Sequence, residues 1–499
     1  MNRSLAFKRL FVWTSLELWD FQKIFQVIIF LLSALILSGL IVISSSSQVV
    51  LVPVGIFILY FLVKRPELGV LAIIVIIASI IFETSLPQLH LPGARLHVTD
   101  IILFALLMKI PFKALTDRNF RFLTTPLDFP LLIFIFAAFI SAGVSIFVYG
   151  LDFNWVVGTG LRRIMYYFLF FVITNLIRDK KQIRVIFGGL FGIAVIVSLA
   201  MIIQAKVGES VHIMPGRVES TGQAFQATRI IPPGEVAIFV TFISAVCAMS
   251  IMNKPFFRTA YFYLIPVFGG GLLLTYNRQY WGSEIFSLFV FAVLISKRGK
   301  RRFFSWLAIV IVSIILIVLP LTRLSKTFRD YSGSIVERFS SIFTVKETFA
   351  SSSLEWRKLE NQYAWRSIVK HPIFGIGLYN RYRPPVPGQE DRKDWDVRYF
   401  IHNGYLWILI NMGLLGFLPF MCFYISFLAR GFSNWRKIRD PIEKSAVIGY
   451  TISGIALSLS ILVEPRIMQD YGIVVIATII GLNEVIIKRN DKGSHASGR

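Results

Sequence analysis

Apolar runs of about 20 residues recur along almost the whole chain, and short polar or glycine-rich segments separate them. An α-helix needs this length to cross a hydrocarbon core of ~30 Å. The first run, 24–43, is too long for the apolar core of a cleaved signal peptide. We therefore predict about fourteen transmembrane spans, some of them short enough to be tilted or broken. Their approximate ranges are 24–43, 48–63, 68–83, 98–112, 127–149, 161–177, 185–204, 233–252, 259–276, 279–296, 303–321, 403–429, 445–463 and 468–487.

Lys and Arg gather in every second loop between these spans. The basic loops are 64–67, 113–121, 178–184, 253–258, 297–302 and 430–444. The alternate short loops, 44–48, 151–160 and 464–467, carry almost no Lys or Arg. Because short cytoplasmic loops of membrane proteins are enriched in Lys and Arg, this alternation predicts that both termini are cytoplasmic.

The spans and loops divide the chain into five segments. We predict an all-α, polytopic transmembrane helix bundle of about 12–14 spans with one large extracytoplasmic loop that contains short helices. The segments are a basic and aromatic cytoplasmic N-terminus (1–23), a bundle of about 11 spans (24–321), the large loop (322–402), about 3 C-terminal spans (403–487) and a cytoplasmic tail (488–499). In the loop, Pro372 and the following glycines predict a helix that ends near Lys370.

Composition agrees with a membrane protein, since 55% of the residues are hydrophobic and 16% are charged. The net charge of +24 raises the question of nucleic acid binding, but much of the basic excess lies in loops where topology explains it. We therefore predict membrane lipids as partners and no nucleic acid.

The sequence offers no pattern typical of a metal site or of nucleotide hydrolysis. The histidines (90, 97, 212, 371, 402 and 495) lack the spacing of zinc ligands, and neither a Walker A sequence nor G-x-S-x-G occurs. The first external loop, SSSSQ, has no carboxylates. Both cysteines, Cys247 and Cys422, fall inside spans, where packing is the expected role. We predict no metal and no cofactor.

His402 and Arg278 are the first candidates for chemistry on the external side. His402 immediately precedes a span, and an imidazole there can accept a proton from a hydroxyl near neutral pH. Arg278 lies in a short external turn, TYNRQYWG, and a guanidinium group can bind phosphate bidentately. The alternatives are an interfacial histidine that makes hydrogen bonds alone and an arginine that reaches to lipid headgroups.

Further arginines lie on the same predicted side. Arg217 and Arg229 flank an external loop, Arg162 and Arg163 begin another span, and Arg357 and Arg366 lie in the large loop. If several of them converge, they form a site for a diphosphate. Binding of lipid phosphates in general is the alternative for any one of them.

Two motifs give the chain a family resemblance. WRSIVKHPIFGIGLYN followed by HNGYLWILINMGLLGF resembles the signature of the O-antigen ligase and polymerase family of bacterial membrane proteins. TYNRQYW is similar to a short turn of that family, although Asn277 replaces a small hydroxyl residue. The resemblance extends over roughly 70–485 and is strongest in 357–417.

The resemblance implies an enzyme of the bacterial cytoplasmic (inner) membrane that acts at the outer face. The implied reaction transfers a glycan from undecaprenyl diphosphate to a hydroxyl of an acceptor glycan, lipid A core or another surface glycan, without a metal. His402 would be the base, Arg278 and Arg229 would bind the diphosphate, and Arg217, Arg357 and Arg366 are further candidates.

Three alternatives follow from the same residues. A polymerase of O-antigen or exopolysaccharide uses the same donor and has the same signature, so the sequence does not separate it from a ligase. A lipid-linked oligosaccharide flippase also has many spans, but it should place charged residues midway through them. A metal-dependent polyprenyl-phosphate-sugar transferase is disfavoured because the first external loop lacks a carboxylate pair.

Overall fold

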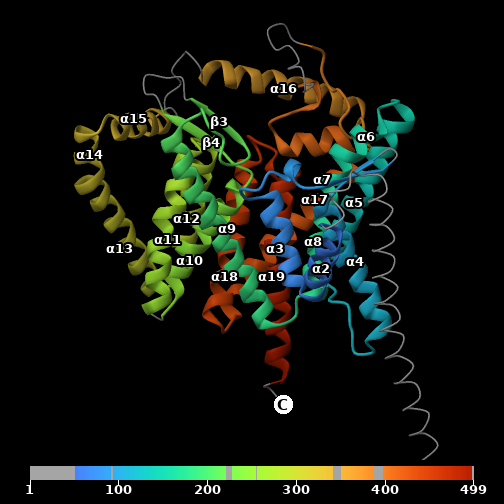
Figure 1. Ribbon diagram of the computed structural model, residues 1–499, viewed down its shortest axis with the longest axis horizontal. Helices are drawn as coiled ribbons and strands as arrows, with labels where there is room; N and C mark the ends of the chain where they lie inside the picture. The colour runs from blue at the N-terminus through green and yellow to red at the C-terminus, as the bar shows by residue number, and fades with distance from the viewer. Residues whose placement is uncertain are drawn as a thin grey trace, which may run out of the picture.

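The computed structural model of the chain describes residues 51–91, 94–220, 227–253, 255–340, 350–385 and 397–496. Most of the helices run side by side in one bundle (Figure 1). The predicted all-α membrane bundle is confirmed. The N-terminal segment 1–23 and the predicted span 24–43 lie outside the described residues. Each of the other predicted spans coincides with a described helix.

The helices are named here in chain order. The first half of the chain forms α2 (Leu51–Lys64), α3 (Pro66–Ile77), α4 (Val98–Thr116), α5 (Asp128–Gly143), α6 (Phe153–Trp155), α7 (Arg162–Met165), α8 (Leu169–Leu176), α9 (Lys180–Val207) and α10 (Glu235–Ile251). The second half forms α11 (Pro255–Leu274), α12 (Arg278–Leu294), α13 (Lys297–Ser313), α14 (Leu319–Leu324), α15 (Lys326–Ser340), α16 (Ala350–Lys370), α17 (Gly404–Asn434), α18 (Pro441–Ser460) and α19 (Asp470–Ala496). Helix α19 continues well into the predicted C-terminal tail.

Length and apolarity mark six helical stretches of the described residues as able to cross a membrane. They are Asp128–Val148, Phe153–Leu176, Lys180–Val207, Lys297–Leu324, Gly404–Lys437 and Asp470–Asp491. Shorter apolar helices at Gly55–Lys64, Pro66–Ile77, Glu235–Ile251 and Arg258–Leu274 pack among them. The chain is therefore an integral membrane protein, and a bundle that contains both short and long helices explains why several predicted spans fall short of 20 residues.

Hydrogen bonds and ion pairs join the predicted cytoplasmic loops to one another at one end of the bundle. The contacts include Gln182 with Glu67, Arg178 with the Arg121 carbonyl, Lys180 with Asp440, and Arg302 with Asn253. We call this the basic end, which is the lower end in Figure 1. The alternation of helix direction agrees with the predicted one. The side of the membrane that the basic end faces stays a prediction.

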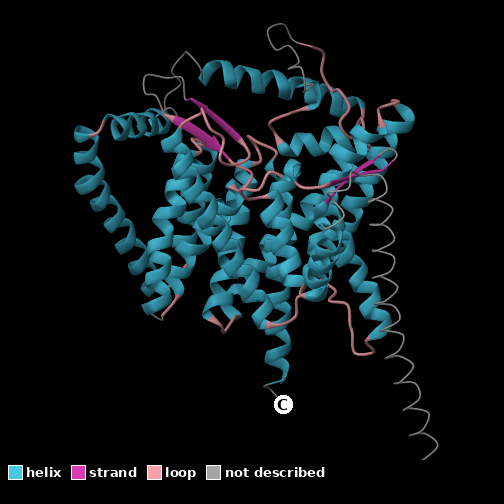
Figure 2. Cartoon of the chain, in the orientation of Figure 1, coloured by secondary structure: helices cyan, strands magenta, loops and turns pink. Residues whose placement is uncertain are grey.

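The opposite end, which we call the site end, carries α15, α16 and two antiparallel hairpins (Figure 2). The hairpins are β1 (Gln88–Leu91) with β2 (Ala94–His97), and β3 (Arg217–Ser220) with β4 (Thr228–Ile231). Helices α13 and α14 lean away from the bundle and lead up to α15 (Figure 1). Helix α16 crosses above the bundle and ends at Lys370, as predicted.

The predicted loop 151–160 is wrong, because most of it is helical. Asp152 accepts a hydrogen bond from the backbone N–H of Trp155 at 2.8 Å and starts a helix there. The helix then runs through a wide turn at Val156–Leu161 into α7. Gly160 serves packing here, since a Cβ at this position would lie 2.7 Å from the Tyr379 ring.

The predicted span 403–429 is helical but broken at Gly413, whose φ of 61° lies in the left-handed region. The break is filled by the turn that follows α16. In this turn Ile376 donates its N–H to the Ile410 carbonyl at 2.8 Å, and Leu414 donates to the Pro372 carbonyl at 2.8 Å. Buried irregular backbone is tolerated in a membrane when protein groups satisfy it. The P-x-F-G-x-G motif (372–377) and the G-L-x-G motif (413–416) thus pack against each other through these hydrogen bonds. We call this pair of segments the interlock.

Candidate active site

The interlock holds α16 above the start of α17. His402 lies just before that helix. The Nδ1 atom of His402 is 2.8 Å from the Oε2 atom of Glu360 on α16. The same oxygen accepts the backbone N–H of His402 at 3.3 Å. Glu360 is buried, with 2% of its side chain exposed, whereas His402 keeps 32% exposed. One imidazole nitrogen is therefore held by a buried carboxylate while part of the ring stays open.

Arg357 lies one turn before Glu360 on the same side of α16. Its Nε is buried and has no hydrogen-bond partner among the described residues. Burial lowers the pKa of Arg357, and the nearby carboxylates Glu464 and Glu360 offset part of that shift. A buried guanidinium nitrogen without a partner is available to an anionic ligand.

Arg366 lies on a different side of α16 from Arg357. Nine residues separate the two, which is two and a half turns of a helix, so their side chains leave α16 in opposite directions. Arg366 instead lies over the Tyr363 ring at 5.7 Å. The structure does not bring Arg366 to His402.

Arg229 on β4 fixes the turn between α11 and α12. It donates to Glu219 at 2.9 Å, to the Thr275 carbonyl at 3.1 Å and to the Asn277 side chain at 2.7 Å. Burial lowers the pKa of Arg229, and Glu219 offsets part of the shift. These contacts with protein groups make Arg229 a support for the turn that carries Arg278.

Asn277 uses both ends of its amide group in this turn. The oxygen accepts from Arg229, and the nitrogen donates to Glu235 at 3.0 Å. A serine hydroxyl is too short to bridge the two partners in this way. The hydrogen bonds around this turn therefore require an amide side chain. This accounts for Asn277 at a position where the family that the chain resembles has a small hydroxyl residue.

Behind this turn lies a buried ion-pair chain. Arg466, between α18 and α19, contacts Glu235 at 2.7 Å and Glu464 at 2.5 Å. Glu464 in turn accepts a hydrogen bond from Gln279 of α12. Arg466 and Glu235 are almost fully buried, with 5% and 0% of their side chains exposed. The chain connects the ends of α10, α12 and α18 and so fixes the floor beneath α16.

Three arginines from different helices converge above this floor. Arg278 of α12 and Arg357 of α16 lie close enough for their charges to repel. Burial, together with the neighbouring Arg229 and Arg278, lowers the pKa of Arg338 of α15 to about 10. A group of like charges that lowers the pKa of its own members is suited to an anionic ligand.

Arg217 has a more exposed position at the edge of the site. It pairs with Glu219 at 2.7 Å, and Glu219 is shared with Arg229 across the β3–β4 hairpin. Of the predicted residues, the structure thus brings together His402, Arg278, Arg357 and Arg229, with Arg217 at the periphery.

Sequence reasoning missed Glu360, Arg338 and Arg466 as parts of this site. Glu360 lies 42 residues from its histidine, and nothing in the sequence indicates that pairing. Arg466 carried a usable signal, because it is the one basic residue of the predicted external loop 464–467, whose only other charged residue is Glu464.

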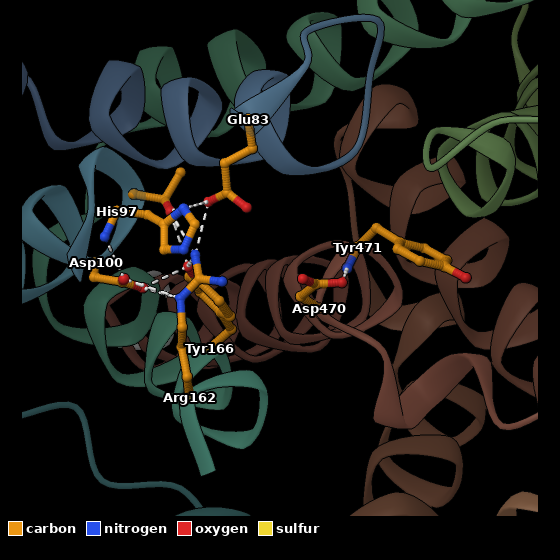
Figure 3. A network of polar contacts seen from close by, with 8 residues as sticks. Glu83, His97, Asp100, Arg162, Tyr166, Asp470 and Tyr471 are labelled. Atoms are coloured by element: carbon orange, nitrogen blue, oxygen red, sulfur yellow. Dashed lines mark hydrogen bonds and ion pairs between the residues drawn. The ribbon is translucent and has the colours of Figure 1, made fainter. Parts of the chain in front are cut away.

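A second polar network lies at the site end between β2, α4 and α7 (Figure 3). Arg162 contacts Asp100 at 2.9 Å and Glu83 at 2.7 Å, and it donates to the Tyr166 hydroxyl at 2.9 Å. Its neighbour Arg163 donates to the Tyr379 hydroxyl at 2.6 Å. Arg162 is therefore engaged by two carboxylates, and neither arginine joins the cluster near His402 in these contacts.

One part of the chain matches a known protein family. Residues 262–421 match the O-antigen ligase family model. The match begins in α11, contains the TYNRQYW turn, α16 and His402, and ends in α17. The predicted family is confirmed over these residues. No curated protein matches the chain.

The O-antigen ligase family match supports a glycosyltransferase-like activity of the ligase or polymerase type. It implies a lipid-linked glycan and an acceptor as substrates. Among the described residues, no group of three or more His, Cys, Asp or Glu side chains is arranged to hold a metal ion.

Proposed function

We propose that this O-antigen ligase domain transfers a glycan from undecaprenyl diphosphate to a hydroxyl group of an acceptor glycan, at the outer face of the cytoplasmic membrane. The observation that carries the proposal is the pair formed by His402 and the buried Glu360, with Nδ1 2.8 Å from Oε2. Arg357, on the same side of α16 as Glu360, adds a guanidinium group to it.

His402 acts as the general base. Glu360 accepts a hydrogen bond from the Nδ1–H group and fixes the ring, which leaves Nε2 with its lone pair for the acceptor hydroxyl. The carboxylate also stabilises the imidazolium that forms when the proton arrives. Glu360 is in this scheme a positioning residue, since it acts through His402.

Arg278 and Arg357 bind the donor diphosphate. Their mutual repulsion is relieved when an anion lies between them, and the charge on the leaving diphosphate grows during the reaction. Arg338 adds a further positive charge. Arg229 orients the turn that carries Arg278, and direct contact of Arg229 or Arg217 with the diphosphate stays a prediction.

The proposed step is a substitution at the anomeric carbon of the donor sugar. The acceptor oxygen forms a bond to that carbon, and the bond between the carbon and the diphosphate oxygen breaks. The acceptor proton moves to Nε2 of His402. The lipid diphosphate leaves with the electron pair, and the arginines stabilise its charge.

The proposal includes the topology predicted from the sequence. The site end faces away from the cytoplasm, and the basic end faces the cytoplasm. The segment 322–402 then forms the extracytoplasmic loop over a bundle of spans from 24–321 and 403–487. The candidate site lies at helix ends rather than midway through spans, which favours a transferase over a flippase.

The test uses the purified full-length protein in liposomes with undecaprenyl-diphosphate glycan and an acceptor, in the presence of EDTA. We expect a new glycosidic product with the wild type and a rate lower by about 100-fold or more with His402→Ala. Product that forms at the wild-type rate with His402→Ala would overturn the base assignment. A wild-type protein that forms product only after a divalent metal is restored would overturn the metal-independent mechanism. Donor alone distinguishes two outcomes: lengthened chains indicate a polymerase, and dependence on added acceptor indicates a ligase.

A further inference from the structure

A hollow of about 420 Å³ opens on the other side of α16 from Arg357. Its lining includes three basic side chains, Arg366, Lys370 and Arg381. Among the described residues that line it, none is Asp or Glu. Neither Arg366 nor Lys370 has a carboxylate within 4.0 Å in the described part of the chain. A concave surface whose described lining has three cations and no carboxylate is complementary to a phosphate-bearing group.

The same hollow carries groups that recognise more than charge. Tyr149, Tyr363 and Tyr382 contribute aromatic rings with hydroxyl groups. Tyrosines that present both an apolar ring and a polar end are common where a ligand or surface is partly wet. The lining therefore suits a polar headgroup that also presents apolar C–H groups to the tyrosine rings.

An exposed apolar stripe runs along the Asp128–Val148 span, which contains α5 and ends beside the hollow at Tyr149. Phe129, Phe136, Phe139 and Phe147 lie within one face of the Asp128–Val148 span, and Phe147 has 87% of its surface exposed. Tyr149, two residues beyond Phe147, lines the hollow itself. On a membrane-spanning helix such a stripe faces acyl chains, so the hollow stands at the membrane surface where that stripe ends.

We propose that the hollow binds the phosphate-bearing headgroup of a membrane lipid, whose acyl chains lie along the α5 stripe. The cations neutralise the phosphate, and the stripe supplies the apolar contact that a soluble phosphate cannot use. The lipid is held on the flank of α16 that faces away from Arg357, so this site is separate from the diphosphate cluster.

Tyr382 connects the hollow to the candidate active site. It lines the hollow, and the charge of Glu360 helps to raise the pKa of its hydroxyl, an effect that comes mainly from burial. The Tyr382 hydroxyl also donates to the Phe400 carbonyl at 3.1 Å, two residues before His402. The binding of the lipid does not rest on the proposed function.

The test measures lipid selectivity with the full chain in phosphatidylcholine nanodiscs. Spin-labelled phosphatidic acid is compared with spin-labelled diacylglycerol, which has the same chains and no phosphate. We expect the wild type to immobilise phosphatidic acid preferentially, and the double variant R366E/K370E to lose about tenfold or more of that preference. Lys358→Glu is the matched control, because Lys358 is an exposed lysine of α16 that does not line the hollow.

Three results would overturn the inference. They are equal immobilisation of both lipids by the wild type, a preference for phosphatidic acid that survives in R366E/K370E, and displacement of phosphatidic acid by an equal concentration of inorganic phosphate. The last result would assign the hollow to a free anion. Because the readout is binding rather than glycan transfer, failure of the proposed reaction leaves these outcomes unchanged.

Discussion

His402 and Glu360 lie 42 residues apart in the sequence, yet the Nδ1 atom of the histidine is 2.8 Å from the carboxylate oxygen. The helix α16 carries Glu360, and the interlock between the turn after α16 and the break at Gly413 brings this helix over the start of α17. The two family motifs therefore position the helix that carries Glu360, although the motifs themselves lie away from the His402–Glu360 pair. They hold a carboxylate against a histidine.

The carboxylate gives the first prediction. Replacing Glu360 by Gln keeps the shape but removes the charge that orients and stabilises the imidazolium, so kcat should fall about 100-fold. In the double variant with His402→Ala, the loss should be no larger than in His402→Ala alone, because Glu360 acts through His402. Initial rates of glycan transfer in liposomes measure both effects. Glu355→Gln, an exposed carboxylate of α16, serves as control, and additive losses in the double variant would refute the coupling.

Arg357 gives the second prediction. Arg357→Ala removes a half-buried guanidinium from the proposed diphosphate site, and kcat should fall about 100-fold or more because charge develops on the leaving group. Arg357→Lys should recover part of the rate, since it restores the charge without the bidentate geometry. Lys358→Ala changes the adjacent residue and should leave the rate at the wild-type level. An equal loss in both positions would point to a general effect on α16.

The sequence predicted the bundle well because crossing a membrane imposes a length and a charge asymmetry that are visible along the chain. The loop predicted at 151–160, between two apolar runs and almost free of Lys and Arg, is wrong, because most of the segment is helical and Gly160 lets the Tyr379 ring approach it. Apolar periodicity also cannot reveal the break at Gly413, because the break is stabilised by a turn from elsewhere in the chain.

For the site, the sequence predicted individual residues better than their grouping. His402, Arg278 and Arg229 were candidates from their positions at span ends. Helical periodicity alone separates Arg357 from Arg366, since nine residues place them on opposite sides of α16. The partnership with Glu360 depends on tertiary packing and could not be predicted from one sequence.

Asn277 gives the third prediction. Asn277→Ser removes the amide that bridges Arg229 and Glu235 and leaves buried polar atoms without partners. The free energy of unfolding should fall by about 1–3 kcal/mol. Chemical denaturation in detergent measures the change, and Asn154→Ser, at an exposed position of α6, is the control. An unchanged stability would mean that the bridge contributes nothing.

His97 gives a prediction of pH dependence. Burial lowers the pKa of His97 below its ordinary value of about 6.5, and Arg162 lowers it further, while Glu83, Asp100 and Asp470 partly oppose the shift. The unfolded chain then binds a proton more readily than the folded one. The contribution of His97 to stability is therefore complete above about pH 6.5 and is lost as the pH falls below it.

The measurement for His97 is the melting temperature of the wild type and of His97→Gln between pH 5 and pH 8, a range taken around the ordinary pKa of about 6.5. We expect the melting temperature of the wild type to fall more with acidification than that of His97→Gln. Parallel curves for the two proteins would show that His97 does not titrate in this way.

Gly413 gives the last prediction, which concerns the interlock. Its φ of 61° is unfavourable for a residue with a side chain, and a Cβ there would lie 2.3 Å from the Ile373 carbonyl oxygen. Gly413→Ala must therefore displace the turn after α16, and we expect a loss of about 2–4 kcal/mol in stability. The displaced turn should also move Glu360 from His402 and lower kcat. Gly188→Ala in α9, where a Cβ meets nothing within 4 Å, should be neutral or slightly stabilising. If Gly413→Ala kept both stability and rate, the interlock would not be what positions the site.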